Sequence, residues 1–458
     1  MQVSESPEIS VTELSSSDPD GHEESSTLSR LAGIQNPRTG LITGIQRIPI
    51  PPDEPAIAAY VVERENFEPL TDGQAMAHEE GGAAFGDEAA RVATYGEAIE
   101  RYCGCLYREA GLRTAAYTDL PGPALDPTTV VNFSESQRRA VEDGTDLCER
   151  DDELSWVVGE ALNTGDTAFL PAQLVYLSYP PAAEPFIRNP ISSGLAAGES
   201  REMAIHSGCC ELVERDAFVT YYLTETELPV IDPTSAPPRV RRLIDRVTAH
   251  GLAVTLLDAT TDLGIPVVIA VLIDSEARPA VTVAAAAGMS IPAVIESALA
   301  EAVQTRLSAI QRLDATDRSP ADVAVEEITA FADRALFWAS QARISDLDFW
   351  IESDRETTVD AMDPVDAMDP DDEATLDPVE RITAAGYDLY AVDVTTRDVS
   401  NLGFSVQRVI APRLQPLYLV ERLRYFGGER LYETPVEMGY RETSPRETDL
   451  NTVPHPFP

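Results

Sequence analysis

Short apolar runs alternate with longer stretches of helical periodicity along most of the chain. The runs predicted to be strands are rich in apolar and β-branched residues and lie between turn-forming residues. They cover residues 39–50, 56–63, 252–260, 265–274, 279–288, 387–395 and 404–412. The longest apolar run, 265–273, is far too short to cross a bilayer and is typical of a buried strand.

Helical periodicity predicts three long helices. The first starts with Asp87 as its N-cap and ends near Gly111, the second fills most of 190–224, and the third spans 291–313 after Ser290. A glycine-rich segment precedes each of the first two helices and is predicted to be a loop. Because helices and strands alternate throughout, the expected fold class is mixed α/β.

Two segments depart from this alternation. Residues 1–30 are polar and acidic and are predicted to be disordered. Strands are expected within 31–77, followed by one large catalytic domain over 78–458. An acidic, proline-broken insertion at 355–378 contains VDAMDP twice in tandem and is predicted to be a flexible surface loop.

Charge narrows the possible partners. The formal net charge is −44, and all 34 basic residues are arginine. Such an excess of carboxylates repels nucleic-acid phosphates and anionic membranes, so neither is an expected partner, and it is typical of adaptation to high salt. Five cysteines without a pairing pattern, and no signal-peptide pattern at the start, favour a cytoplasmic protein.

The first two long helices share the pattern E-x-x-E-R. Its members are Glu97, Glu100 and Arg101 in the first helix, and Glu211, Glu214 and Arg215 in the second. Residues three apart lie on the same helical face, so each pair of glutamates projects together. One such copy is common on a solvated face, but two copies among small and apolar residues favour a functional site.

The third long helix offers Glu301, Gln304 and Arg306. Clustered carboxylates suit Mg²⁺, and arginines beside them suit phosphate oxygens. Together these residue types predict a phosphoryl-transfer site. The chain has no Walker A motif and no lysine that could serve one.

Three segments resemble the YcaO family in order and spacing: "EAARVATYGEAIERY", "EPFIRNPISSGLAAGESREMAIHSGCCELVERDAF" and "ALAEAVQTRL". The resemblance implies a YcaO-type fold of repeated helix-on-sheet subdomains with mixed and antiparallel sheets. It also implies an ATP and Mg²⁺ site that activates a peptide amide oxygen. When the site residues of the family are carried over to the matching positions, the resemblance implies two sets of residues. The Mg²⁺ ligands are Glu97, Glu100, Glu211 and Glu214, and the nucleotide-binding residues are Arg101, Ser193, Arg215, Gln304 and Arg306.

The chain ends in the proline ladder "PHPFP", residues 454–458. It resembles the P-x-P-x-P ending of the family branch that makes azoline rings from Cys, Ser or Thr of ribosomally made peptides. Proline favours a stiff, extended chain that loses little entropy on docking. The resemblance therefore makes the Pro458 carboxylate a candidate general base or structural clamp, against the alternative of a frayed end.

The leading hypothesis is thus an ATP-dependent peptide cyclodehydratase. The resemblance implies a peptide substrate, a separate E1-like partner that binds the leader peptide, and a homodimer. Three alternatives keep the ATP site but use sulfide for a thioamide, an amine for an amidine, or water for peptide cleavage. A further alternative is a non-catalytic scaffold that binds nucleotide.

Overall fold

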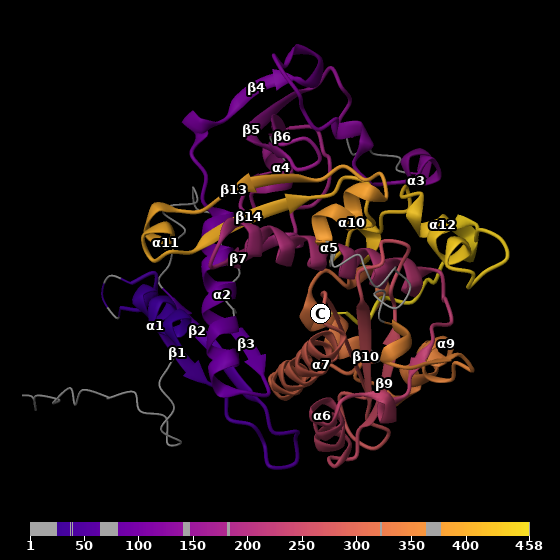
Figure 1. Cartoon of the computed structure of the whole chain (residues 1–458). Coiled ribbons are helices and arrows are strands. Elements are labelled where there is room, and N and C mark those ends of the chain that lie inside the picture. Colours follow the sequence, from indigo (N-terminus) through magenta and orange to yellow (C-terminus); the bar gives the residue numbers. More distant parts are fainter. Residues whose placement is uncertain are drawn as a thin grey trace, which may run out of the picture.

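In the computed structural model the described residues form three β-sheets, each packed against a long helix (Figure 1). The structure describes residues 25–36, 38, 40–64, 81–140, 147–180, 184–320, 323–362 and 377–457. Helix α2 (Asp87–Cys105) covers the first sheet, α5 (Arg201–Leu223) the second, and α7 (Ile291–Asp314) the third.

The first sheet is an antiparallel array in the order β1-β2-β3, with bounds Ile42–Arg47, Ala58–Arg64 and Gly81–Ala84. The second has the order β4-β5-β13-β14-β7, with β6 paired to β5. Its strands are β4 (Arg113–Ala116), β5 (Glu153–Ala161), β6 (Asp166–Pro171), β7 (Leu195–Gly198), β13 (Tyr390–Asp393) and β14 (Ser405–Ile410). All its pairings are antiparallel.

The third sheet has the order β11-β10-β9-β8-β12. Its strands β8 to β12 are Val230–Ile231, Ala253–Asp258, Val267–Ile273, Val281–Ala287 and Glu356–Thr357. Only the β8–β12 pair among the described strands is parallel. These antiparallel and mixed sheets confirm the predicted fold class.

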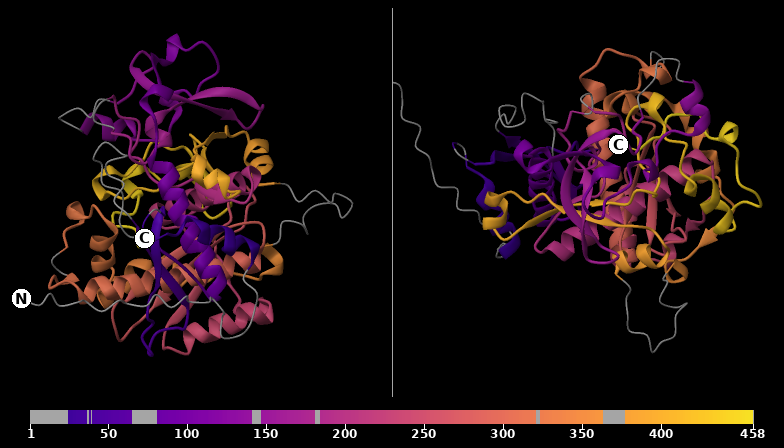
Figure 2. Two further views of the ribbon diagram at one scale, coloured as in Figure 1. Left: turned by 90° about the vertical axis from the view of Figure 1, so that its left-hand side faces the viewer. Right: turned by 90° about the horizontal axis from the view of Figure 1, so that it is seen from above.

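The shorter helices surround this frame. They are α1 (Ser26–Leu31), α3 (Glu135–Ala140), α4 (Ala172–Val175), α6 (Pro238–Thr248), α8 (Phe331–Phe337), α9 (Asp348–Ile351), α10 (Pro378–Ala384), α11 (Arg397–Asn401) and α12 (Arg430–Glu437). Figure 2 shows the strands β4 to β6 at one end of the molecule and α6 with α7 at the other. None of the described helices is long and apolar enough to cross a bilayer.

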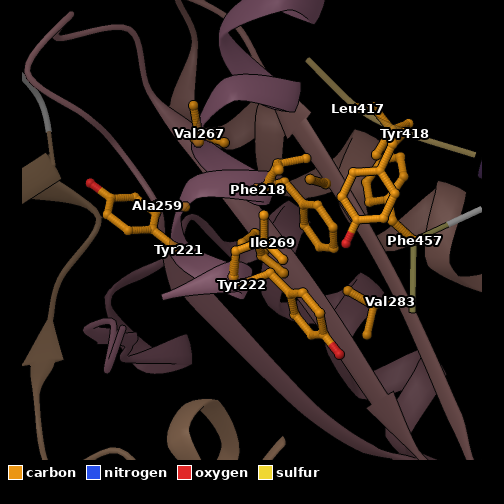
Figure 3. Packing of buried hydrophobic residues seen from close by; sticks show 14 of the residues in the cluster. Phe218, Tyr221, Tyr222, Ala259, Val267, Ile269, Val283, Leu417, Tyr418 and Phe457 are labelled. Carbon is orange, nitrogen blue, oxygen red and sulfur yellow. The ribbon is translucent and has the colours of Figure 1, made fainter. Parts of the chain in front are cut away.

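Strand β10 explains why residues 265–273 are continuously apolar. Alternate side chains of a strand point to opposite faces. Val267, Ile269 and Val271 join one core cluster with the aromatic residues of α5, and the intervening side chains join a second cluster with α7. Figure 3 shows the first of these packings. Helices cover both faces of the strand, so no position along it favours a polar residue.

The two glycine-rich segments predicted to be loops are strands instead. Residues Gly81–Ala84 form β3 and Leu195–Gly198 form β7. Small residues are needed because the following helix lies directly against each strand. A Cβ atom at Gly82 would lie 2.5 Å from the Thr94 nitrogen of α2, and one at Gly198 would lie 2.6 Å from the Ala204 nitrogen of α5.

The boundaries of three predicted segments also need correction. The segment 1–30 was predicted to be disordered, but Ser25 caps α1, whose Leu28 and Leu31 are buried in the core; residues 1–24 lie outside the described residues. Within the predicted insertion 355–378, Glu356–Thr357 is strand β12, and 363–376 lies outside the described residues. The first long helix ends at Cys105 rather than near Gly111, and its N-cap is Gly86 rather than Asp87.

Candidate active site

Helices α2, α5 and α7 line one large cavity together with β3, β7 and Phe457, the last described residue of the chain. Its volume is about 1790 Å³. Pockets for single small ligands typically measure about 300–1,000 Å³. The cavity therefore has room for a nucleotide and part of a second substrate.

Glu97 and Glu100 face this cavity from α2. Glu97 accepts a hydrogen bond from the Gly81 N–H of β3 at 3.2 Å, and Glu100 accepts one from the Ala197 N–H of β7 at 2.9 Å. These carboxylates therefore tie α2 to the glycine-rich strands of two different sheets. Arg101 lines the same cavity and contacts Glu97 at 3.5 Å.

Helix α5 repeats this arrangement. Glu211 accepts a hydrogen bond from the Gly194 N–H beside β7 at 3.0 Å, as Glu97 does from β3. Arg215 contacts Glu211 at 3.3 Å and also pairs with Glu214. Glu211 and Arg215 line the cavity, whereas Glu214 is buried behind them.

Helix α7 contributes Glu301 and Gln304 to the cavity. The Gln304 side-chain amide donates to the Gly81 carbonyl at 3.2 Å, so it also contacts β3. The sequence already singled out Glu301 beside Gln304 on this helix, but did not include it among the four expected Mg²⁺ ligands. Ser193, predicted to lie near the nucleotide, lines the cavity beside β7 and is buried.

Arg306 is not where the predicted phosphate contact requires it. Its buried guanidinium pairs with Glu54 at 2.7 Å and with Asp274 at 2.8 Å, and it donates to the Pro279 carbonyl at 3.0 Å. Its neighbours Thr305 and Leu307 line the cavity, but Arg306 points away from it into the protein. The helical turn separates these directions, and the buried Glu54 with the half-buried Asp274 holds the side chain in place, so Arg306 makes a structural contact here instead of lining the cavity.

Burial and mutual repulsion make the ionised form of the carboxyl groups around the cavity unfavourable. Burial raises the pKa of Glu100 to about 8, with the nearby charges of Glu211 and Glu97 adding to the effect. Burial likewise raises the pKa of Glu301 to about 7 and raises those of Glu97 and Glu214. Such crowding of acids indicates a site that is completed by cations.

These residues fit Mg²⁺ bound together with a polyphosphate. Among the described residues, no three acidic, histidine or cysteine side chains meet closely enough to hold a metal by themselves. Mg²⁺ at nucleotide sites commonly takes one or two carboxylates and completes its shell with phosphate oxygens and water. The glutamates of α2, α5 and α7 supply such carboxylates to one cavity, which Arg101 and Arg215 also line.

The proline ladder is docked rather than frayed over its described residues. The Pro454 carbonyl accepts hydrogen bonds from the Tyr222 hydroxyl at 2.9 Å and the Trp338 indole at 3.0 Å. His455 is buried and its Nε2 lies 2.8 Å from the Tyr418 carbonyl. Phe457 packs beside α5 (Figure 3) and lines the cavity.

Phe457 links this tail to the predicted nucleotide residues. Its ring lies 4.3 Å from the Arg215 guanidinium carbon and 4.6 Å from the Phe218 ring. The sequence did not predict this contact, because the P-x-P-x-P pattern accepts any residue type at position 457. The predicted base or clamp, Pro458, lies outside the described residues.

Comparison with known proteins identifies the same family as the sequence motifs. A family model described as YcaO cyclodehydratase, ATP- and Mg²⁺-binding, matches residues 81–415. An uncharacterised protein of Methanothermobacter thermautotrophicus is 30% identical over 336 residues, which cover 71% of this chain and 79% of that protein.

Two solved structures share the fold. A heterocyclase in complex with substrate and cofactor superposes with a TM-score of 0.74 at 23% identity, covering 95% of this chain and 57% of that one. The YcaO protein of Methanopyrus kandleri, bound with AMPPCP and Mg²⁺, superposes with a TM-score of 0.58 at 19% identity, covering 86% and 92% of the two chains. The present chain thus spans little more than half the length of the heterocyclase.

Proposed function

Because the chain belongs to the YcaO family, we propose that it uses ATP to activate a backbone amide of a ribosomally made peptide. The reaction we propose is cyclodehydration, in which a Cys, Ser or Thr side chain closes onto the preceding carbonyl to give an azoline. The observation that carries this proposal is the gathering of carboxylates from three helices, two arginines and the docked proline tail around one cavity.

ATP and Mg²⁺ are the cofactors of this family. Glu97, Glu100, Glu211 and Glu301 are the cavity residues that would hold Mg²⁺, with Glu214 behind them supporting Arg215. When bound, Mg²⁺ neutralises charge on the phosphate chain.

In the proposed overall reaction the peptide and ATP give the azoline peptide, ADP and phosphate. The amide oxygen takes the terminal phosphoryl group, the peptide nucleophile bonds to the amide carbon, and that oxygen leaves with the phosphate. The nucleophile and the amide nitrogen lose their protons to a base. Arg101, Arg215, Gln304 and Ser193 all line the cavity. In the proposed reaction the two arginines bind phosphate oxygens, and Gln304 and Ser193 orient the nucleotide.

The size of the cavity and the position of the tail support a peptide as the second substrate. Phe457 brings the tail to the cavity wall beside Arg215. We propose that the Pro458 carboxylate serves as the general base or as a structural clamp. We further propose that a separate partner protein binds the leader part of the peptide and that the enzyme is a homodimer, as the family resemblance implies.

ATP hydrolysis in high salt tests the site. Glu100→Ala and Glu214→Ala should each lower the turnover number at least tenfold, because one removes a cavity carboxylate and the other leaves Arg215 without its buried partner. Glu135→Ala is a matched control, since Glu135 is an exposed helical glutamate paired with Arg139 on α3, outside the residues that line the cavity. Unchanged turnover in both cavity variants would refute the assignment.

Mass spectrometry of the modified peptide tests the chemistry. Loss of one water for each ATP consumed supports cyclodehydration. A product in which sulfur or nitrogen has replaced an amide oxygen, or a cleaved peptide, would refute cyclodehydration and leave the ATP site intact.

A further inference from the structure

A second, smaller pocket adjoins the large cavity, and we call it the side pocket. It has a volume of about 170 Å³ and is lined by residues 189–191, Thr329, 417–420, Leu423 and Tyr425. Four of these residues also line the large cavity: Pro190, Ile191, Leu417 and Leu419. None of the described residues assigned to nucleotide or Mg²⁺ lines the side pocket. The proposed ATP site therefore leaves this space without an occupant.

The side pocket is apolar. No charged residue is among the described residues that line it, in a chain whose net charge is −44. Leucine, isoleucine, valine, proline and tyrosine residues form most of its wall, and Asn189 and Thr329 add an amide and a hydroxyl group. An apolar protein cavity of about 150 Å³ is large enough to hold a benzene molecule. The side pocket thus suits one large apolar side chain better than a phosphate or a metal ion.

Hydrogen bonds hold the walls of the side pocket in place. The Asn189 N–H donates to the Tyr425 hydroxyl at 3.2 Å and so joins the two lining segments. The buried Arg334 guanidinium donates to the Leu419 carbonyl at 3.1 Å and pairs with Glu421 at 2.7 Å. Because these bonds fix the backbone around it, the side pocket is formed before any ligand binds, as most small-ligand sites are.

Leu419 connects the side pocket with the large cavity. This residue is 42% exposed, whereas its neighbours Leu417 and Tyr418 are buried. An exposed leucine by itself is common on protein surfaces. Leu419, however, lines both spaces, so a molecule that extends from one into the other would cover its apolar surface.

The side pocket also lies beside the docked tail. Tyr418 lines it, and the Tyr418 carbonyl is 2.8 Å from Nε2 of His455. Phe457, two residues further along, lines the cavity next to Arg215, and Figure 3 shows Tyr418 and Phe457 in one packed cluster. Two residues of extended chain span at most about 7 Å. A few residues of extended peptide therefore reach from the side pocket to Arg215.

We propose that the side pocket binds one large apolar side chain of the peptide substrate. This inference rests on the proposed function for the peptide, and it adds the kind of residue that the peptide carries: leucine, isoleucine, methionine or phenylalanine, a few positions from the residue that is modified. Burying such a side chain removes its apolar surface from water, which strengthens binding about tenfold or more compared with glycine.

A leucine scan of a model peptide tests the proposal. The probes are fluorescent peptides with one central cysteine between glycines, in which leucine replaces one glycine at a time. Fluorescence anisotropy measures their dissociation constants in high salt, with Mg²⁺ and a non-hydrolysable ATP analogue. Leucine at one preferred position should lower the dissociation constant about tenfold or more relative to the all-glycine peptide, and leucine at distant positions should change it little.

Thr329→Phe fills the side pocket from its rim. Thr329 is exposed and does not line the large cavity, so this variant should fold and bind the all-glycine peptide as the wild type does. It should lose the preference for leucine. Thr167→Phe is the matched control, since Thr167 is exposed on β6 and lines neither space, and it should keep the preference. A scan without a preferred position, or a preference that survives in Thr329→Phe, would overturn the proposal.

Two further outcomes separate this proposal from its alternatives. Anisotropy needs no turnover, so a leucine preference without any azoline product would refute the proposed function and leave the side pocket standing. If Thr329→Phe changed the elution volume in size-exclusion chromatography and left the leucine preference intact, the side pocket would hold part of a second copy of the chain, and the proposal would be wrong.

Discussion

Replacing Glu100 with glutamine should make the ligand-free protein more stable at alkaline pH. Burial raises the pKa of this carboxyl from its ordinary value of 4.5 to about 8. A group that holds its proton more tightly when folded stabilises the fold fully below its unfolded pKa and loses that contribution as the pH rises through the folded value.

The size of this effect follows from the two pKa values. A difference of one pKa unit corresponds to about 1.4 kcal/mol, so ionising Glu100 in the folded state costs about 5 kcal/mol. Part of the side chain remains open to the cavity, and screening there reduces the expected figure to about 3–5 kcal/mol. Glutamine has nearly the same shape and does not ionise, so Glu100→Gln should avoid this loss.

Urea unfolding at fixed high salt, without Mg²⁺ or nucleotide, measures the effect between pH 5 and pH 9. Wild type and Glu100→Gln should be nearly equal at pH 5, where the native glutamate is protonated. At pH 9 the variant should be more stable by the amount above. The exposed Glu135→Gln is the control and should follow the wild type. Parallel curves for Glu100→Gln and wild type would show that Glu100 is not desolvated.

Substitutions at three further residues separate their roles. Phe457→Leu should raise the KM for Mg·ATP roughly fivefold, because it removes the aromatic ring that stacks on Arg215, a contact worth about 1 kcal/mol. Phe457→Tyr keeps an aromatic ring and should keep the KM. An unchanged KM in Phe457→Leu would contradict this coupling. Arg306→Gln should lower the free energy of unfolding by about 3–5 kcal/mol by leaving Glu54 unpaired, while equilibrium dialysis should find unchanged nucleotide affinity in the folded protein. Trp338→Phe should cost about 1 kcal/mol of stability in denaturant titrations, since it removes one hydrogen bond to the tail; a lower turnover at unchanged nucleotide affinity would show that the tail acts in the reaction.

The sequence by itself determined the local elements and the pairing of the glutamates. Apolar runs such as 265–274 correspond to strands because burial on both faces leaves a continuous pattern. The spacing of Glu97 and Glu100 places both on the cavity side of α2, since residues three apart share a helical face. Neither inference depends on distant parts of the chain.

Tertiary structure decided which of these side chains reach the cavity. Periodicity could not show that Glu54, about 250 residues before Arg306, would hold that arginine away from the site. Glycine-rich composition indicated loops, but close packing of α2 and α5 makes the same segments strands. Among the described residues, the buried side chains of Arg188 and Arg408 have no carboxylate partner. The sequence could not show this, because pairing is a property of the folded surroundings and not of the residues themselves.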